Sequence, residues 1–189
     1  VGSEMCIIDS FGDAGSSVVG KDVDDSSARA VANGILDTGG TAMAAPADVS
    51  DGEQVAAMFD TVMSALGTVD VLVNNAGLVS PMLHFFDADE AWWRRIIDVN
   101  LTGHFLCCHR AARIMAKNGG GSIINMSSGG ATRAHRSFTA YDASKGGIEA
   151  LTRATVSYTH LRDHETREDL LFPVLREKKK RGGGGGGGG

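Results

Sequence analysis

Cysteine, proline and tyrosine are scarce in this sequence, whose 189 residues include three, three and two of them. Cys6, Cys107 and Cys108 lack the spacing of a metal or redox motif, so we expect the adjacent pair to be buried thiols of a cytoplasmic protein. No apolar run approaches the roughly 20 residues of a membrane span, and no signal-peptide pattern is present. The formal net charge of -5 gives no reason to expect nucleic acid or an anionic membrane as a partner.

The two ends of the sequence differ in character from the rest. Val1, not methionine, begins the chain, and residues 177–189 read EKKKRGGGGGGGG. A run of A nucleotides followed by a run of G would encode such a stretch, and the preceding TVSYTHLRDHETRED resembles a translated sequencing adapter. We therefore expect a native domain over 1–155 and a disordered read-through tail over 156–189. A genuine flexible tail is the alternative, because linkers are often rich in glycine and charge.

Short apolar runs alternate with helical patterns along the remainder. This alternation predicts an α/β fold with a parallel sheet covered on both faces. Glycines follow two predicted helices at Gly39 and Gly67, and Asp87 with Glu90 has the spacing of a capping box. We expect strands over 4–9, within 41–50, and over 69–73 and 122–128, helices over 25–38, 51–67, from Asp87, 99–121 and 139–154, and a loop over 10–23.

Polar or small residues follow these strands, where parallel sheets bind ligands. Asp9 ends the first strand, where a carboxylate can accept hydrogen bonds from a ribose and repel a 2′-phosphate. Taken alone, Asp9 fits the start of a turn nearly as well. Asp48, before Val49, could accept a hydrogen bond from an adenine amino group, but aspartate is also common at helix starts. Residues 74–77, NNAG, end the third strand, where small residues let the backbone approach a flat ligand.

A serine, a tyrosine and a lysine follow the last predicted strand. Ser128 ends it, and Tyr141 comes thirteen residues later, near the start of a helix. Lys145 lies one helical turn after Tyr141 and shares its face of the helix. A nearby ammonium favours the phenolate form of a tyrosine, which improves it as a general acid and base. Taken alone, the pair is weak evidence, since an ordinary polar pair on a helix surface has the same spacing.

Four motifs together are specific: NNAG at 74–77, DVNLTG at 98–103, GSIINMSS at 121–128 and YDASKGG at 141–147. In this order and spacing they resemble the classical short-chain dehydrogenase/reductase family. The resemblance covers nearly all of residues 1–154 and is strongest from Val69 to Arg153. It implies a Rossmann-type, doubly wound parallel sheet. It also implies hydride transfer between a nicotinamide and a secondary alcohol or ketone.

The resemblance implies a role for each matching residue. Tyr141 would be the general acid and base, Lys145 would promote its ionisation and bind the nicotinamide ribose, and Ser128 would hydrogen-bond the substrate oxygen. Asn100 would hold a water in a proton relay through Lys145. The residues implied to bind the cofactor are Asp9, Asp48, Val49, Asn75, Ala76, Gly77, Tyr141 and Lys145, and no metal is implied.

Parts of the family pattern are absent from the sequence. The first strand with its glycine loop T-G-x(3)-G-x-G and the last strands are missing, so the strand over 4–9 would correspond to the family's second. Without the glycine loop no helix N-terminus remains for the pyrophosphate, and we expect the chain as written neither to bind NAD tightly nor to turn over.

These expectations concern the parent protein. We expect an oxidoreductase that uses NAD in preference to NADP, because no Lys or Arg directly follows Asp9. The substrate would be a small alcohol or ketone, as in 3-oxoacyl reductases or polyol dehydrogenases, and the parent would be a homotetramer or homodimer. A non-catalytic cofactor-binding protein and an inactive fragment are the alternatives.

Overall fold

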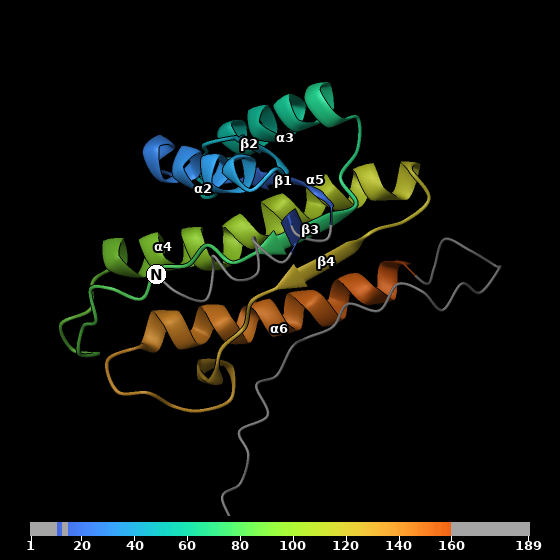
Figure 1. Cartoon of the computed structure of the whole chain (residues 1–189). Coiled ribbons are helices and arrows are strands. Elements are labelled where there is room, and N and C mark those ends of the chain that lie inside the picture. The colour runs from blue at the N-terminus through green and yellow to red at the C-terminus, as the bar shows by residue number, and fades with distance from the viewer. Residues whose placement is uncertain (1–10, 13–14, 160–189) are drawn as a thin grey trace, which may run out of the picture.

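The computed structural model describes residues 11–12 and 15–159, and the side chains up to residue 155. Helices and strands alternate along this part of the chain, as the sequence predicts (Figure 1). The elements are β1 (Ser17–Gly20), α2 (Asp25–Asp37), β2 (Thr41–Ala44), α3 (Gly52–Leu66), β3 (Val71–Asn74), α4 (Glu90–Ile97), a π-helix (Asp98–Thr102), α5 (Gly103–Lys117), β4 (Ser122–Asn125), a short 3-10 helix (Gly129–Ala131) and α6 (Thr139–Thr159).

Local signals set most helix ends. The Asp24 carboxylate caps α2 by accepting from the backbone N–H of Ser27, and Gly67 ends α3 in the left-handed region at φ 77°. The capping residue of α4 is Asp89, which accepts from the N–H of Trp92. The prediction that this helix begins at Asp87 was therefore wrong, because a second aspartate two residues later takes the cap.

The described strands form two parallel pairs. β1 pairs with β2 in the register Ser17–Thr41, and β3 pairs with β4 in the register Val71–Ser122. In a doubly wound sheet of order 3-2-1-4-5-6, the pairs 3-2 and 4-5 lie on either side of strand 1. The parallel α/β prediction is confirmed. Within residues 15–159, however, the sheet consists of these two separate pairs.

The expected loop over 10–23 was wrong in its second half, because β1 occupies Ser17–Gly20. Val18 and Val19 are β-branched and suit a strand, and they lie beside β2 in register with Ala42 and Met43. The predicted strand over 4–9, including Asp9, lies outside the described residues. The sequence prediction placed the strand at the more apolar run over 4–9 and missed the shorter strand at Ser17–Gly20.

Helix α5 lies at the centre of the main hydrophobic core. Its buried residues pack with side chains from α3, from β4 and from the turn after β2, and the cluster comprises Val49, Val55, Phe59, Cys107, Cys108, Ala111, Met115 and Ile123. A second, smaller cluster joins Trp92 and Ile96 of α4 to Ala140 of α6. In Figure 1, α4 and α5 run through the middle of the molecule and α6 runs below them, while α2 and α3 lie at the top.

The adjacent cysteines are buried in this core, as expected. Burial raises the pKa of both the Cys107 and Cys108 thiols to about 11, so both remain protonated and unreactive near neutral pH. No helix among the described residues is long and apolar enough to cross a membrane.

Candidate active site

Three segments converge at the carboxyl ends of β3 and β4. Lys145, on α6, donates from Nζ to the backbone oxygen of Met126, directly after β4, at 2.8 Å. A Cβ placed at Gly77, in the loop after β3, would lie 3.8 Å from that Nζ and 3.6 Å from Oδ1 of Asn100. The motifs that are far apart in sequence therefore meet at one place, where parallel sheets bind ligands.

Lys145 is a buried cation beside a tyrosine. Its side chain is 4% exposed, and Nζ lies 5.6 Å from the centroid of the Tyr141 ring. Burial lowers the pKa of Lys145 from its ordinary value. At this distance the ammonium and the ring form a cation–π contact. Lys145 is therefore buried beside a partly buried tyrosine.

Asn100 lies in the π-helix that joins α4 to α5, and it is fully buried. Its Oδ1 accepts from the N–H of Leu78 at 2.6 Å, and its Nδ2 donates to the Leu78 carbonyl at 2.9 Å. The same Nδ2 lies 3.2 Å from Oγ of Ser144, the neighbour of Lys145. The Asn100 side chain thus ties the loop after β3 to α6. Short π-helical segments within α-helices are rare in proteins, and many of those that occur lie at functional sites.

Ser128 and Tyr141 lie at the two ends of the loop that leads from β4 to α6. The Ser128 Oγ accepts from the N–H of Gly130 at 3.3 Å, which leaves the serine hydroxyl proton available for a ligand. The Tyr141 ring packs edge-on against Phe138, with centroids 6.0 Å apart. Ser127, by contrast, is bonded to Glu149 of α6.

Asp48 and Val49, predicted to contact adenine, follow β2. The Asp48 carboxylate accepts from Ser50 Oγ at 2.6 Å, and the Ser50 hydrogen bonds lower the pKa of Asp48. Val49 is a core residue that packs closely against Gly103 at the start of α5. Asn75 and Ala76 are partly buried in the loop after β3, and Ala76 packs against the main core.

Two polar residues that the sequence interpretation passed over follow β1. Lys21 is partly buried, and its pKa is lowered because the effect of burial exceeds the opposing effect of the nearby carboxylates of Asp22 and Asp48. Asp22 accepts from the N–H of Asp24 at 2.9 Å. Both residues lie at the carboxyl end of β1, and the β-branched pair Val18–Val19 before them was the signal that could have revealed them.

His104 is a second group that the sequence interpretation missed. It is 2% exposed, and its Nε2–H donates to the backbone oxygen of Asn74 at 3.1 Å. Burial, and then the positive charge of Lys145, lower the pKa of His104 to about 4. His104 is therefore neutral near pH 7 and supports the first residue of the NNAG loop.

The buried histidine predicts an acid-sensitive fold. Because the folded pKa of about 4 lies below the ordinary 6.5, the unfolded state binds more protons between these values, and stability falls as the pH falls. We expect a loss of about 2 kcal/mol in the free energy of unfolding between about pH 7 and pH 5 from this group. Urea denaturation at several pH values measures it.

A matched pair of variants isolates the effect. His104→Gln keeps an N–H donor but cannot titrate, so its stability should depend less on pH than that of the wild type. His109→Gln changes an exposed histidine of the same helix and should leave the pH dependence unchanged. Equal slopes for the His104→Gln variant and the wild type would contradict the assignment.

Comparison with known proteins finds relatives over most of the chain. Residues 6–160 match the family model described as enoyl-(acyl carrier protein) reductase. A cis-4-hydroxycyclohexanecarboxylate dehydrogenase of Sinomonas cyclohexanicum is 40% identical over 129 residues, which cover 68% of this chain and 52% of that protein. The 7alpha-hydroxysteroid dehydrogenase of Escherichia coli K12 is 36% identical over 81% of this chain and 58% of its own length. The chain thus spans just over half the length of these curated relatives.

Solved structures agree with the fold. A metagenomic short-chain oxidoreductase (SDR) in complex with NADP superposes with a TM-score of 0.78 at 32% identity, over 83% of this chain and 70% of that one. A gluconate 5-dehydrogenase from Burkholderia cenocepacia J2315 in complex with NADP and tartrate also gives a TM-score of 0.78, at 30% identity, over 84% of this chain and 62% of that one.

Proposed function

Because the chain belongs to the short-chain dehydrogenase/reductase family, as its motifs predict, we propose that its parent protein interconverts a secondary alcohol and a ketone with a nicotinamide dinucleotide. The observation that carries the proposal is Lys145, a buried cation fixed to the end of β4 beside both Tyr141 and Gly77. This arrangement places a phenol and a cation next to a backbone that a flat ring can approach closely.

The described residues fit the nicotinamide half of such a cofactor. Gly77 is exposed, has no side chain to obstruct a ring, and lies beside the Lys145 ammonium, which can donate to a ribose hydroxyl. When bound, the cofactor supplies or accepts a hydride.

Tyr141 would move the proton that accompanies the hydride. In the reducing direction the phenol gives its proton to the ketone oxygen, and in the oxidising direction the phenolate takes it from the alcohol. Ser128 would donate a hydrogen bond to the same substrate oxygen. Lys145 stabilises the phenolate in both directions, and Asn100 keeps the loop after β3 in place against α6.

The cofactor preference remains a prediction. NAD was expected from Asp9, which lies outside the described residues. We propose instead that β1 corresponds to the second strand of the family and that Asp22, which follows β1, supplies the carboxylate. A carboxylate after the second family strand favours the free 2′-hydroxyl of NAD. Lys21 beside it has the opposite tendency towards a 2′-phosphate. The ratio of kcat/KM with NAD and NADP measures the preference, and a ratio that favours NADP would contradict it.

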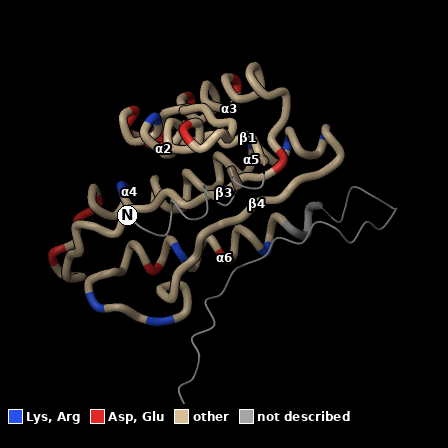
Figure 2. Tube along the Cα trace, viewed as in Figure 1, with Lys and Arg blue, Asp and Glu red and all other residues tan. Residues whose placement is uncertain are grey.

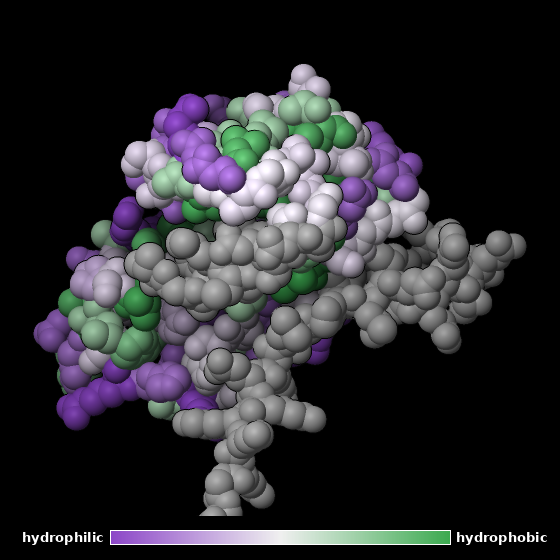
Figure 3. Space-filling view, viewed as in Figure 1, coloured by the Kyte–Doolittle hydropathy of each residue, from purple (hydrophilic) through white to green (hydrophobic). Residues whose placement is uncertain are grey.

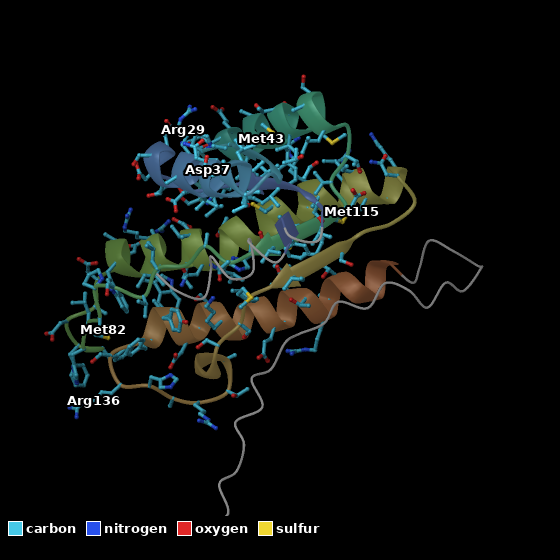
Figure 4. All side chains as sticks on the ribbon, viewed as in Figure 1. Arg29, Asp37, Met43, Met82, Met115 and Arg136 are labelled. Carbon is cyan, nitrogen blue, oxygen red and sulfur yellow. The ribbon has the colours of Figure 1, made fainter. Side chains whose placement is uncertain are left out.

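The substrate would lie between two loops at one end of the molecule. Met82, in the loop before α4, and Arg136, in the loop before α6, are found at this end in Figure 4. The first loop exposes Met82, Phe85 and Phe86, and hydrophobic surface is visible on this side in Figure 3. We therefore propose a small alcohol or ketone with an apolar body.

Assembly and location are also proposals. Phe105 on α5 is 49% exposed and Trp93 on α4 is 40% exposed, which supports a homodimer or homotetramer formed through these helices. The free, buried thiols of Cys107 and Cys108 support a cytoplasmic protein.

An assay of the full-length protein tests the function. Secondary alcohols with NAD or NADP, and the matching ketones with the reduced cofactors, are followed by nicotinamide absorbance, and the panel includes hydroxysteroids, hydroxycyclohexanecarboxylates and gluconate. We expect turnover with at least one substrate. Cofactor binding in a calorimeter without turnover on any of them would instead support a non-catalytic cofactor-binding protein.

A further inference from the structure

The residue after Tyr141 makes an unusual set of contacts. Asp142 lies in the first turn of α6, and its side chain is only 16% exposed. Its Oδ2 accepts from the backbone N–H of His135 at 2.9 Å, and its Oδ1 lies 3.0 Å from Nδ1 of the same residue. Because a carboxylate only accepts, His135 donates both hydrogen bonds. One carboxylate thus grips the backbone and the side chain of a single loop residue.

The same carboxylate packs against the start of the loop. A Cβ placed at Gly130 would collide with Oδ1 of Asp142, so only glycine fits there without a rearrangement. Gly130 is also the residue whose N–H donates to Ser128 Oγ. Asp142 is therefore in contact with the group that orients the serine hydroxyl.

The end of the loop leads directly into the first turn of α6. The backbone N–H of Asp142 donates to the Phe138 carbonyl at 2.8 Å. The Phe138 ring packs edge-on against His135 on one side, at 5.9 Å, and against Tyr141 on the other, at 6.0 Å. Ser137, which directly precedes Phe138, has a φ of 67°. Residues other than glycine rarely adopt this conformation, and it needs support from neighbouring contacts.

We propose that Asp142 is a positioning residue for the substrate. Its carboxylate holds loop 129–138 at Gly130 and at His135, and through His135 it fixes the Phe138 ring as a wall beside the Tyr141 phenol. Loosening this hold moves the wall, so the affinity for substrate falls while the cofactor side of the site is unaffected. The proposal rests on the proposed function, since it concerns the same site.

Kinetics on the full-length protein test the substrate half of the proposal. Asp142→Ala should raise KM for the alcohol or ketone about tenfold and leave the calorimetric Kd for the nicotinamide cofactor within about twofold, a difference of about 1.4 kcal/mol in substrate binding alone. His135→Ala should raise KM in the same direction. His135→Asn should restore the wild-type KM, because the Asn Nδ2 can occupy the place of the His Nδ1. Asp60→Ala, at an exposed aspartate of α3, is the control.

Trypsin tests the loop half independently of activity. Arg133 and Arg136 are exposed on the loop, and basic positions are seen there in Figure 2. Under native conditions Asp142→Ala should be cleaved at these arginines about ten times faster than the wild type, a ratio that corresponds to about 1.4 kcal/mol in the opening of the loop, while Asp60→Ala is cleaved at the wild-type rate.

The outcomes are distinguishable. Faster cleavage with a raised KM supports the proposal, whereas unchanged cleavage, or faster cleavage with an unchanged KM, overturns it. A cofactor Kd that rises as much as KM, or an Asp142→Ala variant that differs only in its melting temperature, also overturns it. If the wild type turns over no substrate, the proposed function fails, and the cleavage rates alone decide whether Asp142 holds the loop.

Discussion

Tyr141→Phe in the full-length protein should lower kcat about a thousandfold, within the range of 10²–10⁴ that a positioned general acid and base contributes. The substitution removes one hydroxyl and keeps the ring. The edge-on packing with Phe138 and the approach of Lys145 to the ring face are preserved, so folding and cofactor binding should be unchanged. Steady-state kinetics measure the loss, and calorimetry with the oxidised cofactor measures the binding.

Two serines provide a matched comparison for the same reaction. Ser128→Ala should lower kcat/KM about a hundredfold, because it removes a hydrogen bond to the reacting oxygen. Ser127→Ala changes the adjacent residue, whose hydroxyl bonds to Glu149, and should have little effect on turnover.

Turnover by Tyr141→Phe within tenfold of the wild type would show that another group moves the proton.

Asn100→Ala should lower the free energy of unfolding by about 3 kcal/mol, since it deletes a buried side chain and leaves polar groups without partners. The Leu78 N–H and C=O lose partners at 2.6 and 2.9 Å, and Ser144 loses a third contact. The loop after β3 then loses its tie to α6, so turnover should fall as well. Urea denaturation of the full-length protein measures the stability.

Asn118→Ala is the control for this effect. Asn118 follows α5, and its Nδ2 donates to Thr68 Oγ1 at 3.0 Å in an exposed setting, where water replaces a lost partner. Its loss should cost less than about 1 kcal/mol. If the two variants were equally stable, the buried side chain of Asn100 would not be the structural tie described above.

The sequence predicted the elements whose signals are local. The helix that begins after Asp51 and ends at Gly67 has a capping side chain and a left-handed glycine within its own few residues, so its bounds were confirmed closely. The strand at Ser17–Gly20 was missed because its identity depends on pairing with Thr41–Ala44. Two adjacent β-branched residues are only a weak signal for a strand, because strand pairing is a long-range property.

The candidate site shows the same division. Tyr141 and Lys145 could be predicted together because helical spacing alone places them on one face. His104 could not, because it meets Asn74 across 30 residues of sequence and its burial depends on the packing of α5. Asp142 was visible only as part of a motif, since its contacts run to a loop with no regular geometry to predict.

The π-helix at Asp98–Thr102 has a consequence for the phase of the long helix around it. A π-turn accommodates one residue more than the α-helix that it interrupts, and each residue rotates a helix by about 100°. The extra residue therefore adjusts the rotation of α5 relative to α4. The helical run formed by α4, the π-helix and α5 can therefore contribute to two hydrophobic clusters. Trp92 and Ile96 pack in the smaller cluster, and Cys107, Cys108 and Ala111 pack in the main one. Removing a residue at Val99 would reset this phase and turn one of the two apolar faces towards water.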